Sequence, residues 1–312
     1  MQDNNYPLVL LYHEVNEKAS PLLNYYDINV HPKIFDQQIK MIKSSFCPIN
    51  FSEFVEAYES GTDIRERILI TFDDGYKSAV QKAVPILQKY DIESIWFLNS
   101  SFWNNDRIFW LSKLMWIYGQ GLLKLFINQA NLRWPGILSL LSENPLPVDV
   151  DRWAKDCYST TLKNFIDEFT NRYGLEERPY SVSNQLYATK DDLNKSSCSI
   201  EYGNHTASHP NLRNISLKQV KNEIIECHDK IKKELLQEPN CFAFPFGEPG
   251  HHWNPYFINI LKQIGYRWIF SVENNDYLVS SNLWRGVIPR HIVPTDVTSK
   301  SSLQAFINSK FY

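Results

Sequence analysis

The sequence predicts an α/β fold, a distorted (β/α)7-type barrel that carries a helical insertion. Short apolar runs of strand length alternate with helical patterns along most of the 312 residues, which is typical of parallel strands joined by helices. About seven such runs occur, a number that suits a closed barrel built from βα units. A tryptophan-rich stretch at about 102–188 breaks the alternation and predicts the insertion. The length fits a single large domain, residues 1–312, with this insertion inside it.

The predicted strands are short runs rich in branched and aromatic residues, bounded by turn-forming residues. They cover Leu8–Val15, Ile68–Phe72, Ser94–Asn99, Cys198–Tyr202, Cys241–Phe246, Trp268–Val272 and Val287–Val293.

The predicted helices lie between these strands and show apolar residues at helical spacing. They cover His31–Ser44, Phe51–Tyr58, Ser78–Tyr90, a helix that begins after Ser216, and a helix from about Asn254 to Ile264. Ser216 has Gln219 three residues later, which is the pattern of a capping box at a helix start.

The insertion between the third and fourth predicted strands contains helical patterns and no strand pattern. Five tryptophans lie in it: Trp103, Trp110, Trp116, Trp134 and Trp153. Such a segment could shape a substrate cleft, or it could only extend the packing. Its apolar face between Phe102 and Ile127 could also lie on a membrane surface, although burial is favoured because most aromatic stripes are core.

Composition narrows the classes of function. The net charge of -3 and the pI of about 6.3 lack the basic footprint of a nucleic-acid-binding protein. Aromatic residues make up 14%, which fits either sugar stacking or core packing. Five scattered cysteines without a CxxC pair indicate a reducing compartment. The chain lacks a signal-peptide pattern and any long apolar span. We therefore expect a cytoplasmic location, with contact to the inner face of the membrane as the less favoured alternative. The sequence does not indicate an oligomeric state.

Two adjacent carboxylates follow the second predicted strand, in the segment Thr71–Gly75. Asp73 and Asp74 therefore lie at the carboxyl end of a strand, the edge of a barrel where catalytic groups gather. Neighbouring carboxylates are costly there unless a cation or a proton compensates them. Taken alone, this segment would more often be a simple Asp-Asp-Gly turn, since such turns are frequent.

Two histidines four residues apart, His205 and His209, follow the fourth predicted strand. This spacing can place both imidazoles on one side of a turn, as metal ligands require. An isolated pair could be two surface histidines. Together with Asp74, however, the pair supplies three ligands and leaves coordination positions open, which is typical of a catalytic metal site. Asp73 would then supply a general base beside the metal.

These segments resemble the first two motifs of the polysaccharide deacetylase family, the NodB-like carbohydrate esterases. Leu11–Val15 is similar to the Tyr-His opening strand of many members. Phe242–Gly247 resembles the third motif in the branch that reads Phe-Ala-Tyr-Pro-Tyr-Gly. Ile288–Arg290 resembles the Leu-Pro-Arg segment near the end of that branch.

The resemblance implies metal-dependent hydrolysis of an N-acetyl or other N-acyl group on a sugar of a polysaccharide, an oligosaccharide or a glycan precursor. Asp74, His205 and His209 would hold the metal, zinc in preference to cobalt, nickel or manganese, and Asp73 would be the base. A precursor on a lipid carrier or a nucleotide suits the expected location. Two alternatives stay open: a sugar deformylase or other amide hydrolase on the same fold, and a non-catalytic carbohydrate-binding protein.

The remaining site residues also come from the resemblance. Phe246, through its backbone N–H, and Tyr76 would contact the substrate or the oxyanion, and Trp253 could stack on a sugar. Many members orient the base with an arginine in the third motif, but this position is Ala243 here, and Arg290 could replace that arginine. The general acid could be His13 or His291, which follows Arg290.

Overall fold

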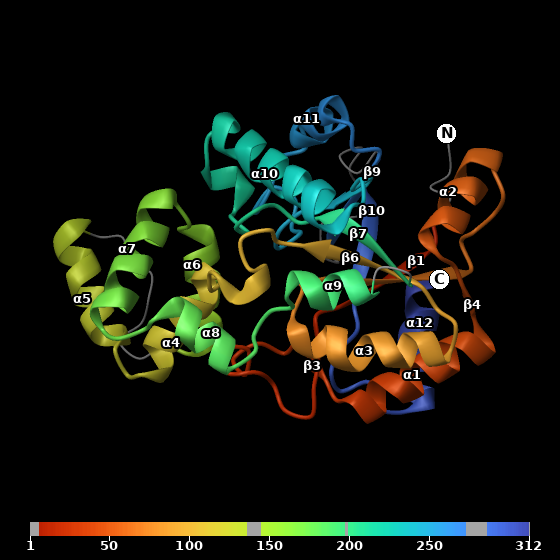
Figure 1. Cartoon of the computed structure of the whole chain (residues 1–312), viewed down its shortest axis with the longest axis horizontal. Coiled ribbons are helices and arrows are strands. Elements are labelled where there is room, and N and C mark those ends of the chain that lie inside the picture. Colours follow the sequence, from red (N-terminus) through yellow and green to blue (C-terminus); the bar gives the residue numbers. More distant parts are fainter. Residues whose placement is uncertain (1–5, 136–144, 197–198, 273–285, 312) are drawn as a thin grey trace.

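Seven parallel strands close into a barrel in the computed structural model, which describes residues 6–135, 145–196, 199–272 and 286–311 (Figure 1). Around the barrel the order is β1-β10-β9-β8-β7-β6-β5, and β1 pairs with β5 to close it. The strands are β1 (Leu8–Tyr12), β5 (Arg67–Asp73), β6 (Ser94–Leu98), β7 (Ile200–Asn204), β8 (Cys241–Ala243), β9 (Trp268–Val272) and β10 (Ile288–Ile292). The predicted (β/α)7-type barrel is therefore confirmed.

The first predicted strand is broken at His13. β1 ends at Tyr12, and the two residues after His13 form β2 (Glu14–Val15), which leaves the barrel to pair with β3 (Asn29–Val30). The buried carboxylate of Glu14 accepts hydrogen bonds from the hydroxyls of Ser20 and Ser78, which holds the chain in this path. The break leaves His13 at the carboxyl end of β1.

The other strand predictions differ from the structure only at their ends. The predicted strand Cys241–Phe246 stops at Ala243, because Pro245 has no N–H to donate to the ladder. The strand predicted to begin at Cys198 runs over Ile200–Asn204, and Cys198 itself lies outside the described residues. A short strand that the pattern did not predict, β4 (Cys47–Pro48), pairs with β5.

Helices surround the barrel. They are α1 (Pro32–Ser45), α2 (Phe51–Ser60), α3 (Lys77–Lys89), α9 (Lys190–Ser196), α10 (Leu217–Leu235), α11 (Phe257–Ile264) and α12 (Lys300–Phe311). In Figure 1, α1, α3 and α12 lie together below the strands, and α10 and α11 lie above them. The Ser216 hydroxyl accepts from the Gln219 N–H, so α10 begins with the predicted capping box. The sequence patterns predicted neither α9 nor α12.

Alternation along each strand separates an inner and an outer apolar layer. The outer layer, with Leu10, Ile70 and Trp96, packs under α1, α3 and α10. The inner layer fills the barrel and includes Val9, Leu69, Ile95, Phe97, Cys241, Phe270 and Ile288. Arg290 and Asp73 are also buried at the carboxyl end of the strands. This end carries the candidate site.

The chain between β6 and β7 forms a short 3-10 helix, η1 (Trp103–Asn105), followed by α4 (Trp110–Gly119), α5 (Leu123–Arg133), α6 (Pro147–Asp156), α7 (Thr160–Arg172) and α8 (Glu177–Ser183). Helices α4 to α8 lie to one side of the barrel in Figure 1. The boundaries of the insertion as a unit, 102–188, stay a prediction.

The apolar face between Phe102 and Ile127 is used inside the protein. Its large side chains, including Phe109, Trp110 and Phe126, are buried in a cluster that the insertion helices form with Tyr76. Core packing, the favoured interpretation, therefore accounts for most of this face, although Leu125 is 38% exposed. In the described ranges, no helix has the length and apolarity needed to span a bilayer.

Candidate active site

Asp73 and Asp74 occupy the end of β5 and the first residue of the turn that follows it. Asp74 lies in the left-handed region with φ 68°, and Gly75 follows at φ 69°. A non-glycine residue in this region is strained by about 1–3 kcal/mol, and such strain concentrates at functional sites. The Asp74 N–H donates to the Phe97 carbonyl on β6 at 3.0 Å, which fixes the turn.

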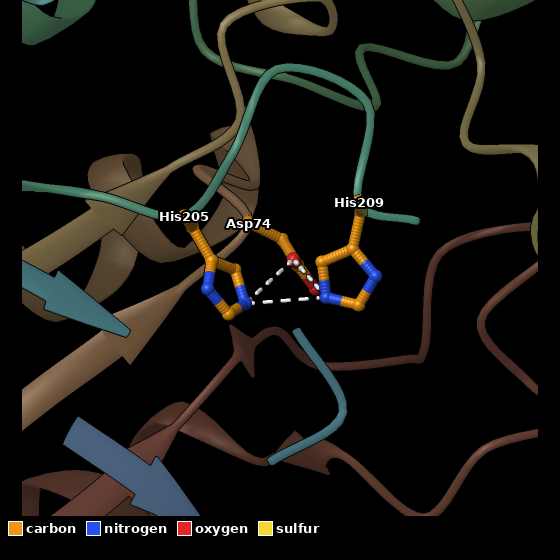
Figure 2. A group of neighbouring side chains, drawn as sticks. All are labelled: Asp74, His205 and His209. Carbon is orange, nitrogen blue, oxygen red and sulfur yellow. Dashed lines mark hydrogen bonds and ion pairs between the residues drawn. The ribbon is translucent and has the colours of Figure 1, made fainter. Parts of the chain in front are cut away.

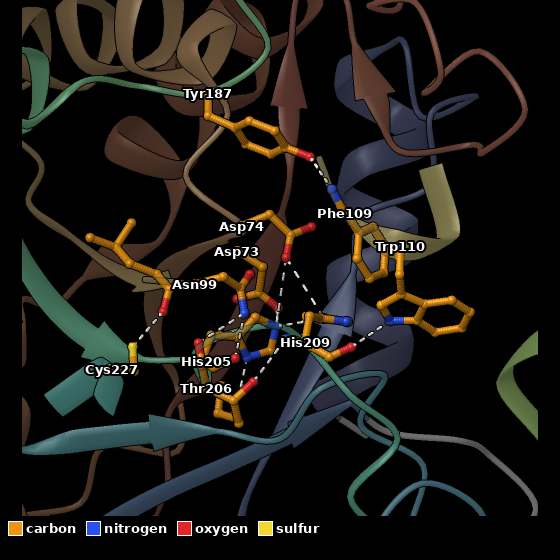
Figure 3. A network of polar contacts seen from close by, with 12 residues as sticks. Asp73, Asp74, Asn99, Phe109, Trp110, Tyr187, His205, Thr206, His209 and Cys227 are labelled. Carbon is orange, nitrogen blue, oxygen red and sulfur yellow. Dashed lines mark hydrogen bonds and ion pairs between the residues drawn. The ribbon is translucent and has the colours of Figure 1, made fainter. Parts of the chain in front are cut away.

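His205 and His209 lie on a loop that begins where β7 ends, and several elements hold this loop (Figure 3). The Asn99 side-chain amide donates to the Thr206 carbonyl at 3.3 Å, and the Thr206 hydroxyl accepts from the His209 N–H at 3.2 Å. From the insertion, the Trp110 indole N–H donates to the His209 carbonyl at 3.0 Å. These bonds fix the backbone of the loop that carries the two imidazoles.

The side chains of Asp74, His205 and His209 point at one common position (Figure 2). The two Nε2 atoms are 3.2 Å apart, and Asp74 Oδ1 lies 3.9 Å from His205 Nε2 and 3.7 Å from His209 Nε2. His205 Nδ1 is 2.8 Å from the Ala243 carbonyl, so its proton is on Nδ1 and the Nε2 lone pair faces the other ligands. Two imidazole nitrogens and a carboxylate oxygen that converge in this way fit a divalent cation such as zinc.

Arg290 clamps Asp73 beside this cluster. Its guanidinium donates two hydrogen bonds to the two carboxylate oxygens, at 2.6 and 2.8 Å, and the arginine has no exposed surface. Asp73 Oδ2 also lies 3.4 Å from His205 Nε2. Burial would raise the pKa of Asp73, but the charge of Arg290 and the hydrogen bonds that it donates outweigh burial and hold this pKa below its ordinary value. Asp73 is therefore ionised at neutral pH.

Asp74 has the opposite electrostatic environment. Burial, together with the negative charge of Asp73, raises the pKa of Asp74 to about 7. Burial lowers the pKa of both His205 and His209. Near neutral pH the two imidazoles are therefore neutral, as metal binding would require, whereas a proton would compete with a metal for Asp74.

We expect the affinity of the protein for zinc to fall as the pH drops below about 7, because Asp74 must lose its proton when the metal binds. One proton displaced per ion gives up to about a tenfold loss per pH unit. Competition with a chromophoric chelator, corrected for the chelator's own protonation, measures this loss. A constant affinity between about pH 6 and about pH 7 would contradict the assignment of Asp74 as a ligand.

A pocket of ≈ 170 Å³ opens beside the cluster and contains most of the predicted site. His13, Tyr76 and Phe246 line it together with Asp73, Asp74 and the two histidines. The Phe246 ring stands perpendicular to the His209 ring with 4.4 Å between their centroids. Tyr76 also acts on Asp74 and lowers the pKa of its carboxyl group.

Two of the predicted site residues lie elsewhere. On β10, His291 follows Arg290, and since consecutive side chains of a strand face opposite ways, His291 points out of the barrel, toward Lys310. Trp253 is fully buried, stacked on Phe244 at 4.1 Å with an interplanar angle of 1°. The predictions of His291 as the acid and of Trp253 as a sugar-stacking residue are therefore wrong.

Part of the pocket wall comes from residues that were not predicted as site residues. Tyr26 and Ile28 come from the loop before β3, and Asp151 and Lys155 come from α6 of the insertion. No sequence motif marks these residues. The tryptophan-rich composition of the insertion was the one signal that this segment could contribute to the pocket.

Comparisons with known proteins agree with this architecture. A family model described as polysaccharide deacetylase matches residues 60–144 and 156–269. None of the curated proteins matches the chain.

Several solved structures are similar to this fold. Streptococcus pyogenes deacetylase PplD, in complex with acetate, has 16% identity and a TM-score of 0.59, with 96% of each chain covered. IcaB from Ammonifex degensii has 15% identity and a TM-score of 0.54, with 96% of this chain and 97% of that chain covered. A de-N-acetylase from Aggregatibacter actinomycetemcomitans has 15% identity and a TM-score of 0.55, with 96% and 98% covered.

Proposed function

Because the chain belongs to the polysaccharide deacetylase family, we propose that it hydrolyses an N-acetyl or other N-acyl group on a sugar with the help of a divalent metal. One observation carries the proposal. An ionised carboxylate, Asp73, is clamped by a buried arginine directly beside three converging metal ligands at the wall of a pocket. A protein that only bound carbohydrate would have no use for this arrangement.

Asp74, His205 and His209 would hold the metal. Zinc suits the two nitrogens and one oxygen best, and cobalt, nickel or manganese are the alternatives. When bound, the metal supplies a Lewis acid for the acyl carbonyl and increases the acidity of water. Three protein ligands leave coordination positions free for these tasks.

Asp73 would accept the proton of the attacking water. Arg290 keeps this carboxylate ionised and fixes its direction, so Asp73 is ready to act as a base at neutral pH. The water attacks the acyl carbon, and the negative charge that develops on the carbonyl oxygen needs a donor. The backbone N–H of Phe246, on the same pocket wall, is the candidate for this donor.

His13 would protonate the leaving amine. It lines the pocket with Asp73, whereas His291 faces away. Burial lowers the pKa of His13 to about 4, while the charge of Asp73 raises it. Negative charge that develops on a bound substrate acts in the same direction as Asp73, so His13 would take up a proton from solvent as the reaction proceeds and pass it to the leaving amine.

We expect His13→Gln to lower kcat by about a hundredfold to a thousandfold, within the range of general acid catalysis, with no change in metal content. His291→Gln is the matched control and should keep kcat within about twofold, because His291 lies outside the pocket. Steady-state kinetics with metal analysis of both variants measures this. A larger loss in His291→Gln than in His13→Gln would reverse the assignment.

The proposal is tested by following acid release and free amine formation on a panel of N-acetylated and N-formylated sugars. Deacetylation gives the higher kcat/KM on acetyl substrates. The alternative, a sugar deformylase, is favoured if formyl substrates react faster, because the same catalytic groups serve both reactions. Tight binding of these sugars with no acid released would leave the carbohydrate-binding alternative instead.

A further inference from the structure

Helix α6 brings a pair of opposite charges from the insertion into the active-site pocket. Asp151 and Lys155 are one helical turn apart, and Lys155 Nζ lies 2.7 Å from Asp151 Oδ2. Both side chains line the pocket that contains His13, Asp73 and the metal ligands. Neither residue belongs to the motifs from which the catalytic groups were predicted.

The helix is fixed to the metal-ligand loop, so the charged pair has a defined place relative to the reacting groups. The buried side-chain amide of Asn211, two residues after His209, donates to the Lys155 carbonyl at 2.9 Å. Asn214 donates in the same way to the Asp156 carbonyl at 2.8 Å. These bonds satisfy carbonyls at the end of α6 that have no partner within the helix.

The pair has hydrogen-bonding capacity that the described residues do not use. Within the described part of the chain, Asp151 Oδ1 is buried and accepts no hydrogen bond. A buried carboxylate oxygen without a donor is costly, so this atom is expected to gain a donor from a ligand. The side chain of Lys155 is 26% exposed and lies 5.2 Å from the centroid of the Phe246 ring. Its ammonium group has three donors, and Asp151 takes only one.

The charges of the pair cancel, which indicates the kind of ligand. The carboxylate offers a hydrogen-bond acceptor and the ammonium offers a donor beside it. Two neighbouring hydroxyls of a neutral sugar can use both, because a hydroxyl can donate as well as accept. An anionic ligand group would meet Asp151 as well as Lys155, and like charges repel. The apolar ring of Phe246 beside Lys155 suits the C–H face of a pyranose.

We propose that Asp151 and Lys155 form a sugar-positioning subsite, in which Asp151 accepts from one hydroxyl and Lys155 donates to another hydroxyl of a neutral glycosyl unit. The subsite orients this unit while its acyl group occupies the metal side of the pocket. The substrate class rests on the proposed function. The two residues act by positioning and take no part in proton transfer.

The test uses the metal-loaded full chain, a short soluble oligosaccharide of N-acetylated hexosamine, and the variants Asp151→Asn and Lys155→Met. We expect each variant to raise KM by about ten- to a hundredfold, the loss typical of a hydrogen bond to a charged group, with kcat within about threefold. Lys163→Met is the matched control. It removes another i,i+4 pair of the insertion, Lys163 with Asp167 at 2.8 Å, with similar exposure but away from the pocket.

Binding without turnover separates this proposal from the proposed function. The dissociation constant of the same oligosaccharide is measured on the metal-loaded Asp73→Asn protein, with and without each subsite variant. If the wild type releases no acid but Asp151→Asn and Lys155→Met weaken this binding, the subsite stands and the proposed function fails. If the wild type turns the sugar over and neither variant changes KM or binding, the subsite is overturned and the proposed function stands.

Three further outcomes would overturn the subsite. Tighter binding in Asp151→Asn would indicate that Lys155 serves an anionic group. A fall in melting temperature larger than in Lys163→Met, with KM unchanged, would show that the pair is structural. No binding of the oligosaccharide to the Asp73→Asn protein would remove the sugar ligand itself.

Discussion

Asp73→Asn should lower kcat by about a thousandfold or more, the range that general base catalysis contributes, while the metal content stays that of the wild type. Asparagine keeps the shape of the side chain and can still accept from Arg290, but it cannot take a proton from water. The proposed metal ligands are Asp74, His205 and His209, so the change should leave the ion in place. Kinetics with metal analysis of the same sample measures both parts.

The matched control is Asp63→Asn. Asp63 accepts two side-chain hydrogen bonds from Arg65, at 2.9 and 2.6 Å, as Asp73 does from Arg290, but that pair is exposed on the surface. We expect no change in kcat for the control. An Asp73→Asn protein with metal bound and near-normal turnover would show that another group activates the water.

Arg290→Met should impair both stability and rate, because it leaves Asp73 buried without its partner. Breaking a buried ion pair by removing one side typically costs about 3–5 kcal/mol of unfolding free energy. The pKa of Asp73 should rise, since burial raises it and Arg290 is the largest opposing cause. The acidic limb of the pH profile of kcat should therefore move to higher pH, with a fall in kcat at neutral pH.

The sign of the pH effect on stability follows from the same contact. Asp73 has a lowered pKa in the folded wild type, so its contribution to stability is present above the unfolded pKa and is lost as the pH falls through the folded pKa. Arg290→Met should therefore abolish the loss of stability that the wild type shows as the pH falls through the folded-state pKa of Asp73. Denaturant unfolding at several pH values measures it, with Arg65→Met as the exposed control. If the Arg290→Met protein folds and the acidic limb of its kcat profile stays at the wild-type pH, Arg290 does not control the pKa of Asp73.

The barrel and much of the candidate site could be predicted because the determinants are local. Strand runs, the Asp-Asp-Gly turn and the His-x-x-x-His spacing are visible within a few residues, and parallel strands bring their carboxyl ends to one edge of the barrel. Asp73 and Asp74 therefore meet His205 and His209, although 130 residues lie between Asp74 and His205 in the chain. The match of the family model confirms the family resemblance.

The places of the remaining site residues could not be predicted, because they depend on tertiary contacts that a single sequence does not reveal. Arg290 and His291 are neighbours in the chain. The orientation of β10 alone decides which of the two side chains points into the barrel. Trp253 follows a glycine and two histidines, a loop pattern, yet it is buried on Phe244. Asp151 and Lys155 reach the pocket because α6 docks on the loop after His209, a tertiary contact without a motif.

The most direct test of the account is a metal titration of the chelator-treated protein with acid release from an N-acylated oligosaccharide as the readout. We expect no turnover without metal, a linear rise on addition of zinc, and a plateau at about one ion per chain, since one set of three ligands serves one ion. Turnover that is the same with and without metal would contradict the account. So would one bound ion per chain with no acid released from any N-acylated sugar.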